Sequence, residues 1–291
     1  MSATTAVRKS RLPFPFGPAR KRPDWLMWVC GGILTLVAFV AIAGPWITPF
    51  SPTAIDFALM NAAPGTGGHL LGTDQNGRDI LSRLMVGTQV SMLGAVLITL
   101  GSTVLALILG AVAGWYGGWI DNVISRVIDF LFAFPALLLA VFAVAVLGPG
   151  LVAPVIALSI GFVPAAARII RNAVVEERSK EYVQSMKVLG FGGVIVFLRH
   201  VFPNVAGPFL SSQFMCFGAS IAELAAISFL GLGVQPPTTD WGLMVSEGQT
   251  SFLSGHVWPV LWPSLAMVLT VVSVNFVGEH FAEKWGGRSD V

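Results

Sequence analysis

Charged side chains are scarce in this sequence: Asp, Glu, Lys and Arg make up 11% of its 291 residues. A water-soluble domain usually carries about a quarter charged residues, so water cannot solvate the whole surface of this protein. Hydrophobic residues make up 55% of the chain, and its mean hydropathy is +0.78. These values exclude a soluble enzyme and a disordered protein, and they indicate that the lipid bilayer is part of the solvent.

Residues that bind metals or nucleotides are also few. Cys30 and Cys216 lie in apolar segments without CxxC spacing, which excludes a disulfide scaffold and predicts two small buried hydrophobic side chains. No GxxxxGK[ST] phosphate loop occurs, so the chain cannot cradle a nucleotide by that motif. The histidines predict no metal site, because they are scattered at His69, His200, His256 and His280.

Long apolar runs are what the sequence does contain. A helix that crosses a bilayer needs about 20 mainly apolar residues. Backbone amides in lipid must bond internally, so runs of this length predict helices, and the period-two alternation of a membrane barrel is absent. The sequence therefore predicts an all-α, polytopic membrane protein with six transmembrane helices, at residues 25–47, 88–113, 123–147, 151–170, 205–230 and 258–279.

The positions of the basic residues predict the orientation of these helices. All Lys and Arg residues except Arg78 and Arg83 fall at the cytoplasmic side if the N-terminus is inside. By the positive-inside rule, both termini are then cytoplasmic. This assigns residues 1–24 and 280–291 to cytoplasmic tails, 48–87 and 231–257 to extracytoplasmic segments, and 171–204 to the long inner loop.

The basic residues before Asp24 also resemble the start of a signal peptide, and Ala41-Ile42-Ala43 resembles a cleavage site. The apolar run over residues 25–43 is longer than the roughly 7–15 residues of a usual signal peptide. We therefore expect an uncleaved first transmembrane helix.

Several residues in the spans perturb a regular helix. Gly110, Gly114 and Gly118 recur every four residues, which lets a second helix approach closely in lipid. Proline has no amide donor, so neighbouring groups must satisfy the carbonyls that it frees. These features indicate either tight helix packing or hinge-like deformation of spans along a pathway; the prolines concerned are Pro135, Pro154 and Pro164.

Two acids lie where the bilayer makes them costly. Glu223 is in the middle of the fifth span and Asp129 is early in the third. A carboxylate at mid-bilayer costs about 2.5–3.5 kcal/mol, so it normally faces protein or a wet cavity. Each acid is a candidate pathway or gate residue, or else a hydrogen-bonded group that holds two helices together. The second interpretation is favoured for Asp129, because Arg126 lies one turn before it.

The inner loop contains a short helix with defined ends. Ser179 can cap a helix that begins at Lys180, and Gly190 can end it in a left-handed conformation. Tyr182, Met186 and Leu189 share one face of this helix. Such a helix lies in the headgroup plane or docks in a groove of a partner, and composition does not choose between them.

The spacing of this loop resembles that of a known family. The residues Glu181-Tyr182-Val183-Gln184-Ser185-Met186-x3-Gly190-x9-His200-x-Phe202-Pro203 resemble the EAA loop of ABC-importer permeases, whose pattern is Glu-Ala-Ala-x3-Gly-x9-Ile-x-Leu-Pro. Gly190 and Pro203 are in register, whereas Gln184-Ser185-Met186 replaces the Glu-Ala-Ala triplet. Other segments are similar to the C-type permease of peptide and nickel importers: residues 69–83, 113–119, 134–140, 147–150 and 228–238, with Trp241-Gly242.

The resemblance implies a permease subunit rather than an enzyme, with no catalytic residue and with an ABC transmembrane type-1 core over residues 88–279 in the cytoplasmic (inner) membrane. The inner loop would contact an ATP-binding subunit through Glu181, Tyr182, Gln184, Ser185, Met186, Gly190 and Pro203, with Tyr182 and Met186 as apolar anchors. That partner would bind ATP and Mg, and this chain would need no cofactor. A B-type permease would complete the pathway, an extracytoplasmic peptide-binding protein would deliver di- or oligopeptides, and nucleic acid would have no role.

The outer segment has two interpretations under this resemblance. In the first, residues 61–83 would contact the binding protein, with Asp74, Arg78 and Asp79 as candidates, or form a lid over the path; in the second, they would form an ordered cap on the helices. The same class of importer also carries nickel, haem, glutathione or opines. A different class, an ion-coupled carrier, would use Glu223 and Asp129 as proton sites.

Overall fold

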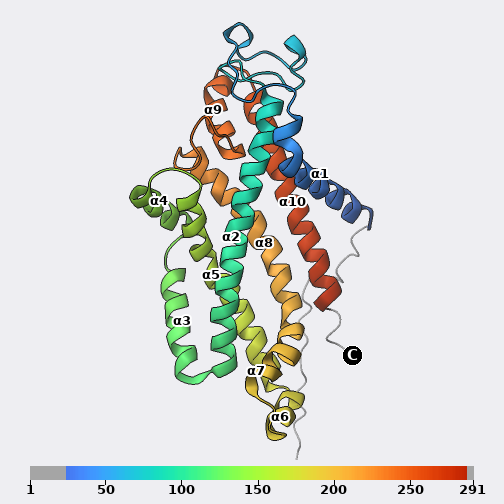
Figure 1. The fold of residues 1–291 in the computed structure, drawn as a ribbon, viewed down its shortest axis with the longest axis vertical. Helices are drawn as coiled ribbons and strands as arrows, with labels where there is room; N and C mark the ends of the chain where they lie inside the picture. Colours follow the sequence, from blue (N-terminus) through green and yellow to red (C-terminus); the bar gives the residue numbers. More distant parts are fainter. Residues whose placement is uncertain (1–23, 287–291) are drawn as a thin grey trace, which may run out of the picture.

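The computed structural model describes residues 24–286, which are almost entirely helical (Figure 1). Residues 1–23 and 287–291, which form most of the predicted N-terminal tail and part of the predicted C-terminal tail, lie outside this range. The helices are α1 (Asp24–Ile47), α2 (Ile80–Tyr116), α3 (Gly118–Phe132), α4 (Ala136–Leu147), α5 (Val152–Ser179), α6 (Glu181–Val188), α7 (Gly193–Val196), α8 (Phe202–Phe229), α9 (Trp241–Leu253) and α10 (Trp258–Gly286). Two short 3-10 helices, η1 (Phe57–Leu59) and η2 (Thr66–Gly68), precede α2, and a π-helical turn, η3 (Phe197–Val201), precedes α8.

Within this range, five helices are long and apolar enough to cross a bilayer: α1, α2, α5, α8 and α10. They match five of the six predicted spans. The helix α2 begins at Ile80, before the predicted residue 88, because the Asp79 side chain caps it by accepting a hydrogen bond from the Ser82 amide at 2.7 Å. Its 37 residues extend over about 56 Å. A bilayer core is only about 30 Å thick, so α2 continues beyond it.

The prediction of one continuous third span over residues 123–147 is wrong. This segment consists of α3 and α4, which are bent by 80° at a short break. Pro135 lies in the break with an extended backbone and precedes the first residue of α4. Because proline donates no amide hydrogen bond and restricts the residue before it, the α3 helix cannot continue through this point. The bent pair gives a sixth span only if both helices are counted together.

Two glycines bring α2 and α5 close together, as predicted. A Cβ atom at Gly110 would lie 1.9 Å from Ile170 Cγ2 and 2.5 Å from the Ala167 carbonyl oxygen. One at Gly114 would lie 2.8 Å from the Arg171 carbonyl oxygen. Gly118 does not share this role, because it begins α3 with φ +56° and no atom lies within 4 Å of its Cβ position. The repeat therefore serves helix packing at its first two positions only.

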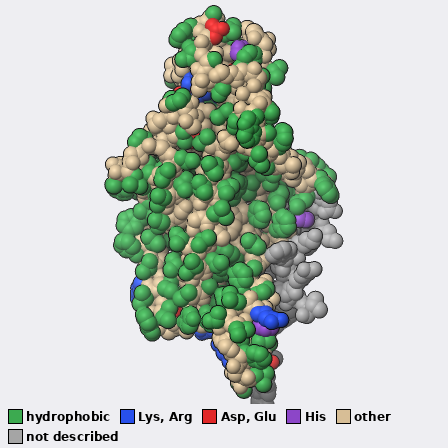
Figure 2. Space-filling view, in the orientation of Figure 1, with side chains coloured by type: hydrophobic (Ala, Val, Ile, Leu, Met, Phe, Trp, Pro, Cys, Tyr) green, Lys and Arg blue, Asp and Glu red, His purple; other side chains and the backbone are tan. Residues whose placement is uncertain are grey.

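The bundle has two distinct ends. Figure 1 shows α2 in the middle, with α6 and α7 at one end and α9 with residues 48–79 at the other. We call these the α6 end and the α9 end. On the face drawn in Figure 2, hydrophobic side chains cover the middle of the molecule, and charged side chains lie toward the two ends. This distribution fits a protein whose middle lies in lipid.

Candidate functional site

A short helix, α6, forms the tip of the α6 end. It begins after Lys180, whose extended backbone separates it from α5. The prediction that Ser179 caps it is wrong, because Ser179 ends α5 and its hydroxyl donates to the Glu176 carbonyl oxygen at 2.7 Å. The prediction for Gly190 is confirmed: it has φ +84°, and its amide donates to the Lys187 carbonyl oxygen at 3.1 Å.

The helix α6 is mounted on the protein's own core. Val183 is fully buried, and Tyr182 and Met186 pack against a buried cluster whose residues come mainly from α5 and also from α2, α3, α7, η3 and α8. Both side chains are only partly buried, so they attach α6 to its own chain, and their predicted role as apolar anchors for a partner stays a prediction. The exposed apolar side chains are Val188 and Leu189, at 87% and 74%. The other predicted loop residues, Glu181, Gln184, Ser185, Gly190 and Pro203, are exposed.

A buried carboxylate that the sequence analysis missed lies beneath α6. Glu177, near the end of α5, is only 5% exposed. Its Oε1 accepts hydrogen bonds from the Tyr182 hydroxyl at 2.6 Å and from Asn204 Nδ2 at 2.8 Å, and its Oε2 lies 2.5 Å from Lys180 Nζ. Burial, together with the adjacent Glu177 carboxylate, raises the pKa of Tyr182 to about 12. Tyr182 therefore remains a hydrogen-bond donor at neutral pH.

Asp129 pairs with a different residue from the one that the sequence suggested. Its carboxylate accepts from Arg168 on α5 at 2.6 Å, and the two side chains are 55% and 44% exposed. The Arg168 guanidinium also lies 4.4 Å from the centre of the Phe132 ring. This geometry supports the interpretation that Asp129 holds α3 against α5.

The charged residues at the α9 end form a buried cluster. We call Asp74, Arg78, Arg83 and Glu247 the four-residue charge cluster. Arg78 Nε lies 2.7 Å from Asp74 Oδ2, Arg78 Nη2 lies 3.0 Å from Glu247 Oε2, and Arg83 contacts both carboxylates. Asp74 is 5% exposed and Arg78 is 9% exposed. The cluster fixes the segment before α2 to α9, which is the ordered cap anticipated as an alternative.

Asp79 is also buried, at 2% exposed, and its Oδ1 lies 2.8 Å from His69 Nδ1. Asp74, Arg78 and Asp79 are thus largely buried in this structure, and their predicted contact with a binding protein stays a prediction. Large exposed apolar side chains at this end include Ile55, Phe57, Leu70 and Leu253. A partner bound here would meet these side chains beside exposed polar ones such as Asp56 and His256.

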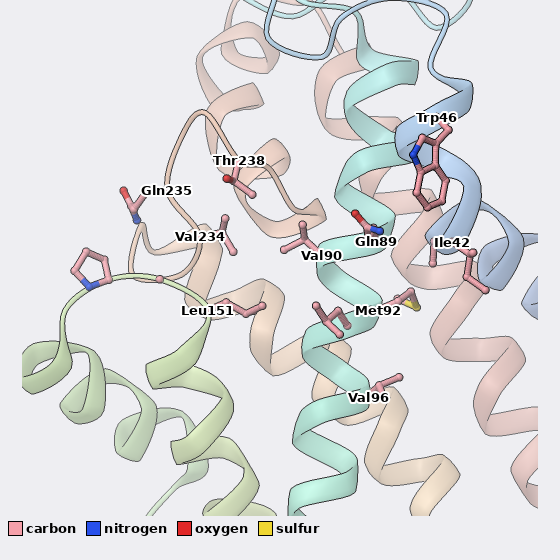
Figure 3. Close-up of a pocket in the computed structure, with 14 residues that line it drawn as sticks. Ile42, Trp46, Gln89, Val90, Met92, Val96, Leu151, Val234, Gln235 and Thr238 are labelled. Carbon is pink, nitrogen blue, oxygen red and sulfur yellow. The ribbon is translucent and has the colours of Figure 1, made fainter.

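A cavity of about 720 Å³ lies between α1, α2 and two loops, residues 149–151 and 234–238 (Figure 3). Its wall is mainly apolar and includes Met92 and Val96, with polar side chains at Gln89, Gln235 and Thr238. A second cavity of about 560 Å³ shares Met92 and Val96 with the first and continues between α1, α8 and α10. Together they form a groove along α1.

Glu223 lies on α8 and has an unsatisfied oxygen. Its Oε2 is buried and has no hydrogen-bond partner among residues 24–286. Ala222 and Ala226, on the neighbouring face of α8, line a third cavity of about 470 Å³. Glu223 thus makes no hydrogen bond through Oε2 that would hold two helices of this chain together. Among the described residues, no three His, Cys, Asp or Glu side chains are grouped to hold a metal ion.

Comparisons with known proteins identify the family. Residues 106–285 match the family described as "Binding-protein-dependent transport system inner membrane component", and residues 22–64 match the "N-terminal TM domain of oligopeptide transport permease C". The chain is 37% identical over 289 residues to the dipeptide transport system permease protein DppC of Escherichia coli (strain K12), covering 96% of each chain. It is 39% identical over 260 residues to the di/tripeptide transport system permease protein DppC of Pseudomonas aeruginosa (strain UCBPP-PA14), covering 86% of this chain and 84% of the relative.

The fold is similar to that of a chain in a solved structure of the MetNI methionine ABC transporter in an inward-facing conformation. The TM-score is 0.55 at 17% identity, over 70% of this chain and 96% of the other. The resemblance predicted from the inner loop and the outer segments is confirmed by these matches. This chain belongs to the family of inner membrane components of binding-protein-dependent transport systems.

Proposed function

We propose that this chain is a permease subunit of an ATP-driven importer of di- and oligopeptides. The main support is the mounting of α6: a helix fixed to the core through Tyr182, Val183 and Met186 presents Val188 and Leu189 to a partner. The names of the relatives support a peptide substrate. The chain has no phosphate loop, so the ATP and Mg would be bound by separate ATP-binding subunits.

The proposal gives each end of the bundle a side of the membrane. The α6 end carries Arg171, Arg178, Lys180, Lys187 and Arg199, so we place it in the cytoplasm, with both termini on the same side. The α9 end then faces outward, where a peptide-binding protein would dock. A related B-type permease would complete the pathway across the inner membrane.

Transport in this scheme is a shift between two packings of the spans, one open inward and one open outward. ATP binding by the partner would move α6, and the bound peptide would be released as the packing changes. A ligand biases such an equilibrium only by its difference in affinity for the two states. The chain therefore needs a mechanical link between α6 and the spans.

The exposed tip of α6 provides the test. We expect Leu189→Asp to reduce co-purification with the ATP-binding subunit by about tenfold or more, because an unpaired carboxylate would be buried in an apolar contact. The measurement is pull-down of the ATP-binding subunit from solubilised membranes. The matched control is Leu253→Asp, a leucine 85% exposed at the opposite end, which should leave co-purification unchanged. Equal co-purification of both variants would contradict the assigned role of α6.

Deletion of residues 180–190 separates the proposal from an ion-coupled carrier. The importer loses ATPase association and uptake while it still inserts into the membrane, whereas a carrier would continue uptake that follows the proton gradient. To identify the cargo, uptake of a labelled dipeptide is measured in the presence of unlabelled nickel, haem, glutathione or opines. Inhibition of this uptake by one of these compounds would indicate that the importer also binds that cargo.

Glu223→Gln is expected to reduce peptide uptake by about tenfold with little change in assembly. A Glu223 carboxylate that faces the pathway would pair with the amino terminus of a passing peptide, and this charge contact is lost when the side chain becomes an amide. Glutamine has almost the same volume, so packing of α8 should be kept. Uptake and complex yield are measured on the same membranes. Normal peptide uptake by the Glu223→Gln variant would indicate that Glu223 serves helix packing and does not line the pathway.

A further inference from the structure

The Glu177 carboxylate lies where three separate elements meet. Its donors come from α6 through Tyr182, from the first turn of α8 through Asn204, and from the linker through Lys180. A buried carboxylate is costly unless charged or polar groups satisfy it, and charge-assisted hydrogen bonds are stronger than neutral ones. The carboxylate therefore holds the end of α5, the helix α6 and the start of α8 in one fixed arrangement.

The covalent connection from α6 to α8 is less suited to transmit a movement than the hydrogen bonds to Glu177 are. It passes through Gly190 in a left-handed conformation, then Gly192 and Gly193, and then the π-helical turn η3. Glycine removes side-chain restraint from the backbone, so residues 190–193 of this connection are compliant, whereas Val196 and Val201 beyond them are buried in the core. The apolar contacts of α6 with the core have no directional preference.

Three side chains of α6 make directional contacts outside it: Gln184 Nε2 donates to the Ser179 carbonyl oxygen at 3.0 Å, Lys187 Nζ lies 4.7 Å from the centre of the Trp115 ring, and the Tyr182 hydroxyl bonds Glu177 and lies 3.4 Å from the His200 carbonyl oxygen. Of these, the Tyr182 contacts lead toward α8, because Asn204 Nδ2 lies 3.3 Å from its hydroxyl.

Beyond the Glu177 contacts, α8 is a helix of 28 residues. Asn204 lies in its first turn, and Glu223 lies about 28 Å further along the same helix at 1.5 Å per residue. A displacement at Asn204 would therefore act on the same helix that bears the unsatisfied Glu223 oxygen.

We propose that Glu177 is a positioning residue for energy coupling: it links α6 to α8, so that movement of α6 by the ATP-binding subunit reaches the span that carries Glu223. The inference rests on the proposed function. It does not require Glu177 to contact substrate or nucleotide, and it leaves the exposed tip of α6 free to bind the partner.

The test uses the complete transporter in liposomes, with both permeases, the ATP-binding subunits and the binding protein. The readout is the number of ATP molecules hydrolysed per labelled dipeptide imported. For Glu177→Ala we expect this ratio to rise about fivefold or more, at the lower end of typical coupling between sites, while co-purification of the ATP-binding subunit stays unchanged. Glu177→Gln keeps an acceptor but loses the charge, so it should give an intermediate ratio.

Three further variants keep the proposal falsifiable. Glu176→Ala, at the exposed neighbouring acid, is the matched control and should keep the wild-type ratio. Tyr182→Phe and Asn204→Ala each remove one hydrogen bond to the Glu177 carboxylate. They test the proposed coupling role of Glu177 if the Glu177→Ala complex does not assemble. Each should raise the ratio.

The outcomes separate this inference from the proposed function. The inference alone is overturned if the wild-type complex imports peptide only with ATP while the Glu177, Tyr182 and Asn204 variants keep the wild-type ratio of ATP hydrolysed to dipeptide imported. Lower thermal stability at an unchanged ratio would give Glu177 a purely structural role and would overturn it equally. A wild-type complex without ATP-driven uptake would overturn both.

Discussion

Gly110→Val is expected to reduce the yield of folded permease by about tenfold or more, because overpacking against backbone exceeds the usual 1–3 kcal/mol. Glycine normally destabilises a helix by about 1 kcal/mol relative to alanine, so a larger residue would be favoured on an open surface. Here the added Cβ would lie 1.9 Å from Ile170 Cγ2 and 2.5 Å from the Ala167 carbonyl oxygen. A backbone carbonyl cannot turn away as a flexible side chain can, so α2 and α5 must separate.

The measurement is the monodisperse fraction after solubilisation, together with the thermal unfolding temperature. Gly32→Val in α1 is the control, because no atom lies within 4 Å of a Cβ at that position. It carries the same β-branched side chain in a helix, and it should leave the yield near the wild-type value. Similar behaviour of the two variants would show that valine propensity, rather than contact between α2 and α5, determines the outcome.

Arg83→Ala is expected to lower the free energy of unfolding by about 3–5 kcal/mol, the usual cost of removing one partner of a buried ion pair. Arg83 is 4% exposed and contacts both Asp74 and Glu247, and it also donates to the Thr239 hydroxyl at 3.2 Å. Without it, two largely buried carboxylates share Arg78 as their remaining cation in the four-residue charge cluster. Arg83→Lys keeps the charge but loses the planar fork, so it should be intermediate.

Denaturant or thermal unfolding in detergent measures the effect. Arg168→Ala is the control, because Arg168 and Asp129 form a pair that is about half exposed. Exposed pairs contribute about 0–1 kcal/mol, so this variant should unfold close to the wild type. Equal destabilisation by the two substitutions would mean that apolar contacts, not the four-residue charge cluster, hold the α9 end together.

Much of the fold could be predicted from apolar length alone. Five spans were located because lipid demands about 20 apolar residues in a row, and that demand is visible in a single sequence. The third segment is a bent pair of helices instead of the one straight helix predicted, because hydropathy reports whether a residue tolerates lipid and not the direction in which the chain runs. Pro135 was visible in the sequence, but the 80° bend depends on how α4 packs against α5.

The site was predicted unevenly for a similar reason. Gly190 could be placed because a left-handed residue at a helix end favours glycine, whatever surrounds it. The face that holds Tyr182 and Met186 was recognised, but periodicity does not tell which side of a helix meets its own core. Asp74 and Arg78 were noticed as charges, and their burial depends on Glu247, 169 positions beyond Arg78. No local pattern reports such a partner.

The long separation within the four-residue charge cluster has a consequence for biosynthesis. Arg83 is made early and Glu247 lies 164 positions later, after three more membrane-embedded elements. With the α9 end facing outward as proposed, Asp74, Arg78 and Arg83 would remain hydrated by water until α9 has emerged from the ribosome and been translocated. A nascent chain stopped before α9 would therefore expose this segment to proteases, and only the nearly completed polypeptide would protect it.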